Sequence, residues 1–243
     1  MNIPEKLIEL RRIMDRENIA AYIISGTDPH NSEYLPAPWQ QRKWISGFTG
    51  SYGTVVVTKN EAGLWTDTRY FIQAEKELAG SGIKLHKLRV PDAVDYPQWL
   101  VEVLESGTKV GIDGFCMSVS DVRNLKNALS PKNITIQKQI DLLGEMWFDR
   151  PALPVEKIIR LDTKYVGESA GERIGKIREF IRDNHGDAML FSCLDEIAWL
   201  YNIRCNDIAY NPVAISYAIV EKDKAHLFIK LDKISQEIEQ QLA

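Results

Sequence analysis

The residues with the clearest capacity for chemistry lie in the first third of the chain, as two short polar pairs. Asp67 and Arg69 are two positions apart after a short apolar stretch. His30 and Glu33 are three positions apart in a long segment that contains prolines. A carboxylate beside a guanidinium can form a strong ion pair, and a histidine beside a carboxylate can transfer a proton or contribute to a metal site.

Neither pair belongs to a recognisable catalytic motif. The four histidines are scattered without HExxH or HxH spacing, and no cysteine has an evident partner. We interpret His30 as a solvated loop residue in preference to a metal ligand. Asp67 is expected to cap a helix that begins near Thr68, with Arg69 bracing a neighbouring loop. Cys193 is expected to be a small buried hydrophobic residue.

A glycine-rich stretch offers a second candidate site. Gly47, Gly50 and Gly53 lead at steps of three into the β-branched run Thr54 to Thr58. The GxxGxxG spacing precedes a strand and no Lys-Ser/Thr follows, so it matches neither a dinucleotide site nor a P-loop. Tight turns account for the glycines. The aromatic residues nearby are expected to lie in the core, except Trp39, which is the best candidate for an exposed contact.

Composition restricts the classes of partner. The formal net charge is -4 and the pI is near 5.7, and no basic stripe favours nucleic acid. The sequence shows neither a basic N-terminal stretch with an apolar region after it nor a run approaching the roughly 18 apolar residues of a membrane span. Three cysteines without CxxC suit a reducing compartment. We therefore expect a cytoplasmic protein that binds neither nucleic acid nor membrane.

The elements that position these residues alternate between helices and strands. Apolar spacing predicts a helix over Pro4 to about Glu17, a strand over 19–24 and a loop over Ser25 to Lys43. Beyond the loop it predicts strands at 54–58, 64–66, 83–88, 109–113 and 134–137, and helices from about 68, at 96–104 and at 119–129. This alternation indicates an α/β fold with a mixed sheet flanked by helices.

After a proline-containing linker at 149–154, the chain repeats this opening. A constant offset of 167 residues relates Leu7, Leu10, Arg11, Met14 and Asp28 to Ile174, Ile177, Arg178, Ile181 and Asp195. Further helices are expected at 194–201 and 233–242, and strands at 214–220 and 225–229.

We predict two tandem α/β units, at 1–157 and 158–243. The second is expected to be incomplete, because it lacks counterparts of the later strands and helices of the first. A partly built sheet leaves an apolar face and an open strand edge. We therefore expect these residues to be a fragment of a longer polypeptide.

The chain also resembles a known family. Its segments 44–54 and 64–71 are similar to the hallmark of creatinase-type N-terminal domains. Segments 28–34, 147–151, 194–200 and 211–213 resemble the long, three-domain, cytosolic type of Xaa-Pro aminopeptidase, the aminopeptidase P family. Thr68 and Tyr52 stand where that family usually has glycine and alanine. Both differences concern the conformation of a loop.

The resemblance implies that the parent protein is a metal-dependent exopeptidase that removes the N-terminal residue from peptides with proline second. In the family, a C-terminal pita-bread domain holds two divalent ions, typically manganese, on two Asp, one His and two Glu. That domain is absent from these residues, so we assign no cofactor, no metal and no catalytic residue to them, and we expect the fragment to be inactive alone.

The resemblance further implies three partners: the protein's own C-terminal catalytic domain, a peptide with an Xaa-Pro N-terminus, and a second copy in a homodimer. N-terminal units of this family border the active-site entrance. His30, Glu33 and Trp39 are therefore candidate residues of a substrate-access rim.

An alternative function is a non-catalytic peptide- or histone-binding module, because creatinase-like domains also occur in the histone-chaperone subunit of the FACT complex. Metal ligands in the downstream sequence would distinguish the two. Creatine and proline-dipeptide hydrolases are closer alternatives, but their single N-terminal unit disagrees with the duplication.

Overall fold

The first helix, α1 (Ile3–Arg16), begins and ends within one residue of its prediction. In the computed structural model, which describes residues 1–138 and 140–242, Asn2 accepts from the backbone N–H of Glu5, and the Glu5 carboxylate accepts from that of Asn2. This capping box satisfies two backbone donors at the helix start. Leu7, Leu10 and Met14 form the buried stripe of the helix.

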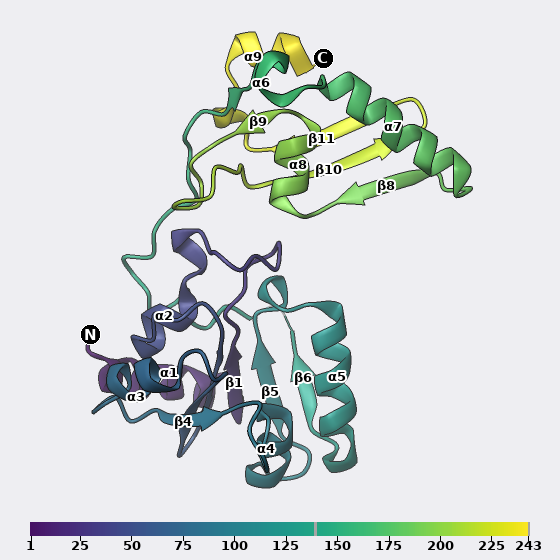
Figure 1. Cartoon of the computed structure of the whole chain (residues 1–243). Coiled ribbons are helices and arrows are strands. Elements are labelled where there is room, and N and C mark those ends of the chain that lie inside the picture. Colours follow the sequence, from purple (N-terminus) through teal and green to yellow (C-terminus); the bar gives the residue numbers. More distant parts are fainter. Residues whose placement is uncertain (139, 243) are drawn as a thin grey trace. The chain divides into compact units, whose positions relative to one another are not determined.

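The residues Met1–Pro151 form one unit, unit 1, around a six-stranded sheet in the order β4-β3-β2-β1-β5-β6 (Figure 1). Strand β2 runs antiparallel to β1 and β3, and the other neighbouring pairs are parallel. The ends of β1, β3, β4 and β5 therefore share one edge of the sheet with the start of β2. The strands are β1 (Ala21–Ile24), β2 (Thr54–Thr58), β3 (Ala62–Thr66), β4 (Lys84–Lys87), β5 (Lys109–Ile112) and β6 (Thr135–Gln137).

Helices cover both faces of this sheet, which confirms the predicted α/β layers. One apolar core joins the sheet to α1, α2 (Gln41–Ser46) and α3 (Phe71–Glu77), and a second joins its other face to α4 (Tyr96–Val103) and α5 (Val119–Leu129). Three short 3-10 turns complete the unit: η1 (Ala37–Trp39), η2 (Gly114–Cys116) and η3 (Ser130–Lys132).

Two predicted boundaries in unit 1 are wrong. The expected loop over Ser25 to Lys43 contains η1 and the start of α2. No side chain caps α2, and the helix stops at Gly47, whose φ of 75° few other residues adopt. Helix α3 begins at Phe71, three residues after the expected start at Thr68, because the intervening residues form a turn.

The residues Ala152–Ala243 form unit 2, in which β8, β10 and β11 pair in the order β11-β10-β8 and β7 pairs with β9. Its apolar core joins one face of the three-stranded sheet to α7, α8 and α9. The elements are β7 (Ile159–Arg160), α6 (Thr163–Val166), α7 (Ala170–Asp183), β8 (Ala188–Phe191), α8 (Leu194–Leu200), β9 (Ile203–Arg204), β10 (Ser216–Glu221), β11 (Ala225–Ile229), η4 (Leu231–Lys233) and α9 (Gln236–Leu242).

The sequence repeat has a structural counterpart in side-chain contacts. Ser169 and Glu172 form the same capping box at the start of α7 that begins α1. Arg11 Nε donates to the carbonyl oxygen of Thr58 at 2.9 Å. Arg178, which is 167 positions later, donates to the carbonyl oxygen of Glu221 at 3.1 Å. Thr58 and Glu221 occupy matching places, because they pair with the first residues of β1 and β8.

The two sheets differ in the exposure of one face. In β1, Ile23 is 2% exposed beneath the core formed with α4 and α5, whereas its counterpart in β8, Leu190, is 65% exposed. Strand register also matches Trp65 of β3 with Phe228 of β11, which are 0% and 54% exposed. The described part of unit 2 therefore leaves uncovered the sheet face that α4 and α5 bury in unit 1.

Candidate functional site

Polar side chains gather at the edge of the unit 1 sheet where the parallel strands end. Ser25 follows β1, Asp67 follows β3, Arg89 lies two residues after β4, and Asp113 follows β5. The loop 50–53 reaches the same edge, because β2 begins there. Ligands of open α/β sheets bind in this position, outside the carboxyl ends of the strands. This edge is the candidate functional site.

A cavity of about 270 Å³ opens beside the loop 50–53. Its wall presents both polar and apolar surface, and the hydroxyl of Thr27 donates to the carbonyl oxygen of Cys116 at 2.6 Å. Burial raises the pKa of the Tyr96 hydroxyl in this wall to about 12, so it remains a neutral donor. The lining residues are Ser25, Gly26, Thr27, Asn31, Ser51, Tyr52, Gly53, Thr54, Tyr96, Cys116, Met117 and Asp121.

The loop is held from beneath by Arg42, a buried residue of α2. Its guanidinium donates to the carbonyl oxygens of Gly50, of Gly53 at 3.0 Å and of Ser51 at 3.4 Å. Burial lowers the pKa of Arg42 to about 10, which still leaves it charged at neutral pH. Three carbonyls on one guanidinium fix the backbone of the loop, and with it the position of Tyr52.

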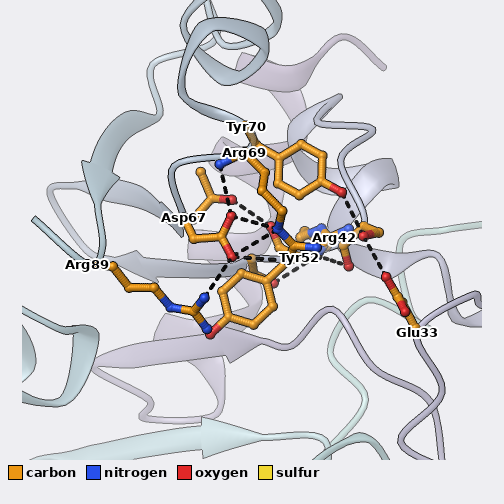
Figure 2. Close-up of polar contacts among 10 residues, drawn as sticks. Glu33, Arg42, Tyr52, Asp67, Arg69, Tyr70 and Arg89 are labelled. Atoms are coloured by element: carbon orange, nitrogen blue, oxygen red, sulfur yellow. Dashed lines mark hydrogen bonds and ion pairs between the residues drawn. The ribbon is translucent and has the colours of Figure 1, made fainter.

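The centre of the site is Asp67, whose side chain is 1% exposed although it is an acid. Arg69 donates to its carboxylate from Nε at 3.0 and 3.2 Å and from Nη2 at 3.0 Å. Arg89 Nη1 lies 3.6 Å away from the same carboxylate (Figure 2). The hydrogen bonds from Arg69 hold the pKa of Asp67 below its usual value, so the carboxylate is ionised at neutral pH.

An exposed aromatic ring lies beside both arginines. The guanidinium carbons of Arg69 and Arg89 lie 5.8 and 5.7 Å from the centre of the Tyr52 ring, within cation–π range. Arg69 also lies 5.2 Å from the ring of Tyr70, whose hydroxyl is 2.8 Å from the hydroxyl of Ser51. The site thus presents two guanidiniums on a fixed aromatic surface.

The three predicted rim residues differ in how exposed they are in the structure. His30 is 8% exposed, so its interpretation as a solvated residue is wrong: Asp28, itself buried, accepts from the backbone of His30 and folds the loop inward. Glu33 is exposed, and its carboxylate accepts from the Ser51 hydroxyl at 3.4 Å. Trp39 is half-buried in η1.

Two further expectations are wrong. Asp67 does not cap α3, because it accepts from the backbone N–H of Arg69 and from its side chain, before the helix begins. Arg69 pairs with Asp67, and its guanidinium also lies 5.8 Å from the ring of Tyr52 in the neighbouring loop 50–53, as the expected brace requires. Cys193 is exposed, because it lies at the N-cap of α8 and not within β8. All three cysteines are free thiols.

Sequence reasoning missed Arg42, Tyr52 and Arg89. The available signal was local: Tyr52 lies inside the singled-out glycine stretch, and Arg89 follows a predicted strand. Nothing in the local sequence marked Arg42 as a buried residue, because arginines are rarely buried. Within residues 1–138 and 140–242, no group of three or more His, Cys, Asp or Glu side chains could hold a metal ion. The helices in that part of the chain are also too short or too polar to cross a bilayer.

Comparison with known proteins gives consistent matches for both units. A family model described as the Creatinase/Prolidase N-terminal domain matches residues 6–143, and a second model with the same description matches 149–243. The chain is 39% identical over 99% of its length to Aminopeptidase P2 of Arabidopsis thaliana, and 39% identical over 99% to Xaa-Pro aminopeptidase 1 of Dictyostelium discoideum. It covers 34% and 40% of those relatives.

A solved structure matches over nearly the whole chain as well. The X-prolyl aminopeptidase of Caenorhabditis elegans, described as a cytosolic enzyme with a di-nuclear active site, superposes with a TM-score of 0.92 at 35% identity. The match covers 99% of this chain and 41% of that one. The chain therefore spans about a third to two-fifths of the length of these relatives.

Proposed function

The chain belongs to the creatinase/prolidase N-terminal domain family, and on that premise we propose that it is the non-catalytic N-terminal part of an Xaa-Pro aminopeptidase. The observation that carries the proposal is the continuous match of both units, in order, to relatives of that name. The parent enzyme would remove the N-terminal residue from peptides with proline in the second position.

We assign the chemistry of the parent enzyme to a C-terminal catalytic domain outside these residues. There, two divalent metal ions, which we propose to be manganese, would supply Lewis-acid chemistry and an activated water. The di-nuclear site of the Caenorhabditis elegans relative supports this assignment. We also propose that the parent protein is cytoplasmic and forms a homodimer.

The uncovered face of unit 2 supports a longer polypeptide. Leu190 and Phe228 expose apolar surface where unit 1 places α4 and α5. Such a face is costly in water and is normally covered. We propose that the second creatinase-like domain, which lies within unit 2, begins at residue 158, and that additional chain completes its sheet and covers this face.

We propose that the loop 28–39 borders substrate access in the parent enzyme, with Glu33 and Trp39 at its surface and His30 supporting it from within. In the full-length enzyme, Trp39→Ala would then lower kcat/KM on an Xaa-Pro tripeptide. Phe115→Ala, which changes another exposed aromatic residue, is the matched control. An equal effect of both substitutions would leave the loop without a role in access.

The function is tested by assaying the 243-residue chain and the full-length enzyme side by side with added manganese. We expect the full-length enzyme to release the N-terminal residue of an Xaa-Pro tripeptide, and to spare the matching Xaa-Ala peptide. The 243-residue chain should give no release above a buffer control. Turnover by the short chain, or failure of the full-length protein to distinguish the two peptides, contradicts the proposal.

A further inference from the structure

The cluster around Asp67 carries an uncompensated positive charge. One buried carboxylate faces two guanidiniums, those of Arg69 and Arg89, so the three groups together hold one net positive charge. Both arginine side chains remain open to solvent, at 53% and 70% exposure. Asp67 therefore orients the two guanidiniums without neutralising them.

The contacts that Arg89 makes within the fold do not explain its unfavourable backbone conformation. Its φ of 59° is a left-handed conformation. This conformation is unfavourable for any residue that has a side chain, so the surrounding structure must offset its energetic cost. Within residues 1–138 and 140–242, its guanidinium makes one ion pair, at 3.6 Å, and one contact with the Tyr52 ring. These are weak interactions for an exposed side chain.

The loop that carries Tyr52 is held in place before any ligand arrives. The guanidinium carbons of Arg69 and Arg89 lie 5.8 and 5.7 Å from the centre of the Tyr52 ring. Arg42 donates to the carbonyl oxygens on either side of Tyr52, and the Thr66 hydroxyl donates to the Tyr52 carbonyl oxygen at 2.6 Å. A rigid platform reduces the entropy lost when a ligand binds. Tyr52 also lines the cavity of about 270 Å³, so a ligand bound to the arginines can extend into it.

Glu33 is a second carboxylate that acts on the cluster. It lies across the cluster from Arg89 (Figure 2), and its negative charge raises the pKa of Arg69 after the larger effect of Asp67. Glu33 is exposed and makes one hydrogen bond, of 3.4 Å, to Ser51. Its charge opposes an incoming anion but leaves the Arg89 side of the cluster open.

We propose that Arg69, Arg89 and Tyr52 form a carboxylate-binding site for a peptide, with the adjoining cavity taking the neighbouring part of the peptide. A guanidinium presents paired N–H donors that match the two oxygens of a carboxylate, and the Tyr52 ring offers apolar surface to the rest of the residue. That the ligand is a peptide rests on the proposed function. The carboxylate is either the C-terminal group or an acidic side chain, which have the same chemistry.

Calorimetric titration of the 243-residue chain at low salt tests this site without any turnover. The probe is the pentapeptide Ala-Pro-Ala-Ala-Glu, with versions in which the terminus is amidated, the glutamate is replaced by glutamine, or both. Loss of binding in the first version assigns the C-terminal carboxylate, and loss in the second assigns the side chain. Equal binding of the doubly neutral peptide overturns the proposal.

Three variants test which side chains determine the affinity of the site for the peptide. Arg89→Gln should weaken binding about tenfold, as expected for a lost charge-assisted contact. Glu33→Gln should strengthen it about twofold, because an opposing exposed charge is removed. Arg12→Gln, which alters an exposed arginine paired with Glu9 on α1, is the matched control and should leave affinity unchanged. Thermal unfolding confirms that each variant is folded.

The proposal fails if Arg89→Gln behaves like Arg12→Gln, or if a lysine-rich pentapeptide binds as tightly as the acidic one. It also fails if inorganic phosphate alone binds as tightly as the peptide, since the site would then be a general anion site. None of these results bears on the aminopeptidase assay. Failure of the two proposals is therefore distinguishable.

Discussion

The buried ion pair of unit 2 allows a prediction in which the magnitude follows from the structure. The side chains of Lys233 and Asp207 are 2% and 0% exposed, and the ammonium donates to the carboxylate. Asp207 also accepts from the backbone N–H of Ile215 at 2.7 Å and from the thiol of Cys205 at 3.3 Å. The pair joins η4 to the loop before β10, so its loss loosens the approach to α9.

Lys233→Met keeps an unbranched chain of similar length but leaves the Asp207 carboxylate buried without its cation. Removing one partner of a buried pair costs about 3–5 kcal/mol, because the other charge remains desolvated. Replacing both, as Lys233→Met with Asp207→Leu, removes the desolvated charges together. The double variant should therefore lose far less than the sum of the single ones, by a coupling of about 2 kcal/mol or more.

Urea unfolding followed by circular dichroism measures these free energies, with hydrogen exchange in unit 1 as an internal control. Lys222→Met is the matched variant, because Lys222 forms an exposed ion pair with Asp187 at 2.8 Å. It should cost less than about 0.5 kcal/mol. The reasoning is refuted if Lys233→Met costs no more than Lys222→Met, or if the two buried substitutions are additive.

Two further predictions concern one buried acid and one exposed apolar residue. The lowered pKa of Asp67 means that its contribution to stability is present above its unfolded pKa, near 3.9, and is lost as pH falls through the folded value. Asp67→Asn should thus cost about 1–3 kcal/mol at pH 7 and flatten the acid limb of a stability–pH curve; an unchanged limb contradicts this. Leu190→Lys should reduce light scattering by the 243-residue chain more than Ile8→Lys, another exposed substitution, while changing its unfolding free energy by less than about 0.5 kcal/mol. Equal scattering by the two variants would show that the β8 face does not associate.

Much of the fold was predictable because it depends on local patterns. Helix α5 and strands β2 and β11 have the bounds that apolar spacing predicts. The duplication followed from a constant offset in sequence, and the matching contacts of Arg11 and Arg178 show that the repeat extends to side chains. Helix α2 was missed because it is six residues long, has no side-chain cap and follows three prolines.

The candidate site was less predictable because its members come from separate elements. Asp67 and Arg69 stood out by their spacing, but local spacing alone suggested a helix cap, and the structure gives an ion pair. Arg89 joins them because β3 and β4 are parallel neighbours, which brings their ends to one edge. His30 was misjudged because its burial depends on how the loop folds against the core.

The sequence by itself determined the α/β class, the two units and the family resemblance, since these reside in periodicity, repeated spacing and contiguous motifs. Only the tertiary structure decided which charges meet. Asp67 faces two arginines through strand order, Arg42 supports the loop of Tyr52 from another helix, and Leu190 is exposed where Ile23 is buried. Burial and electrostatic pairing depend on distances between residues far apart in the chain, and local sequence patterns do not record those distances.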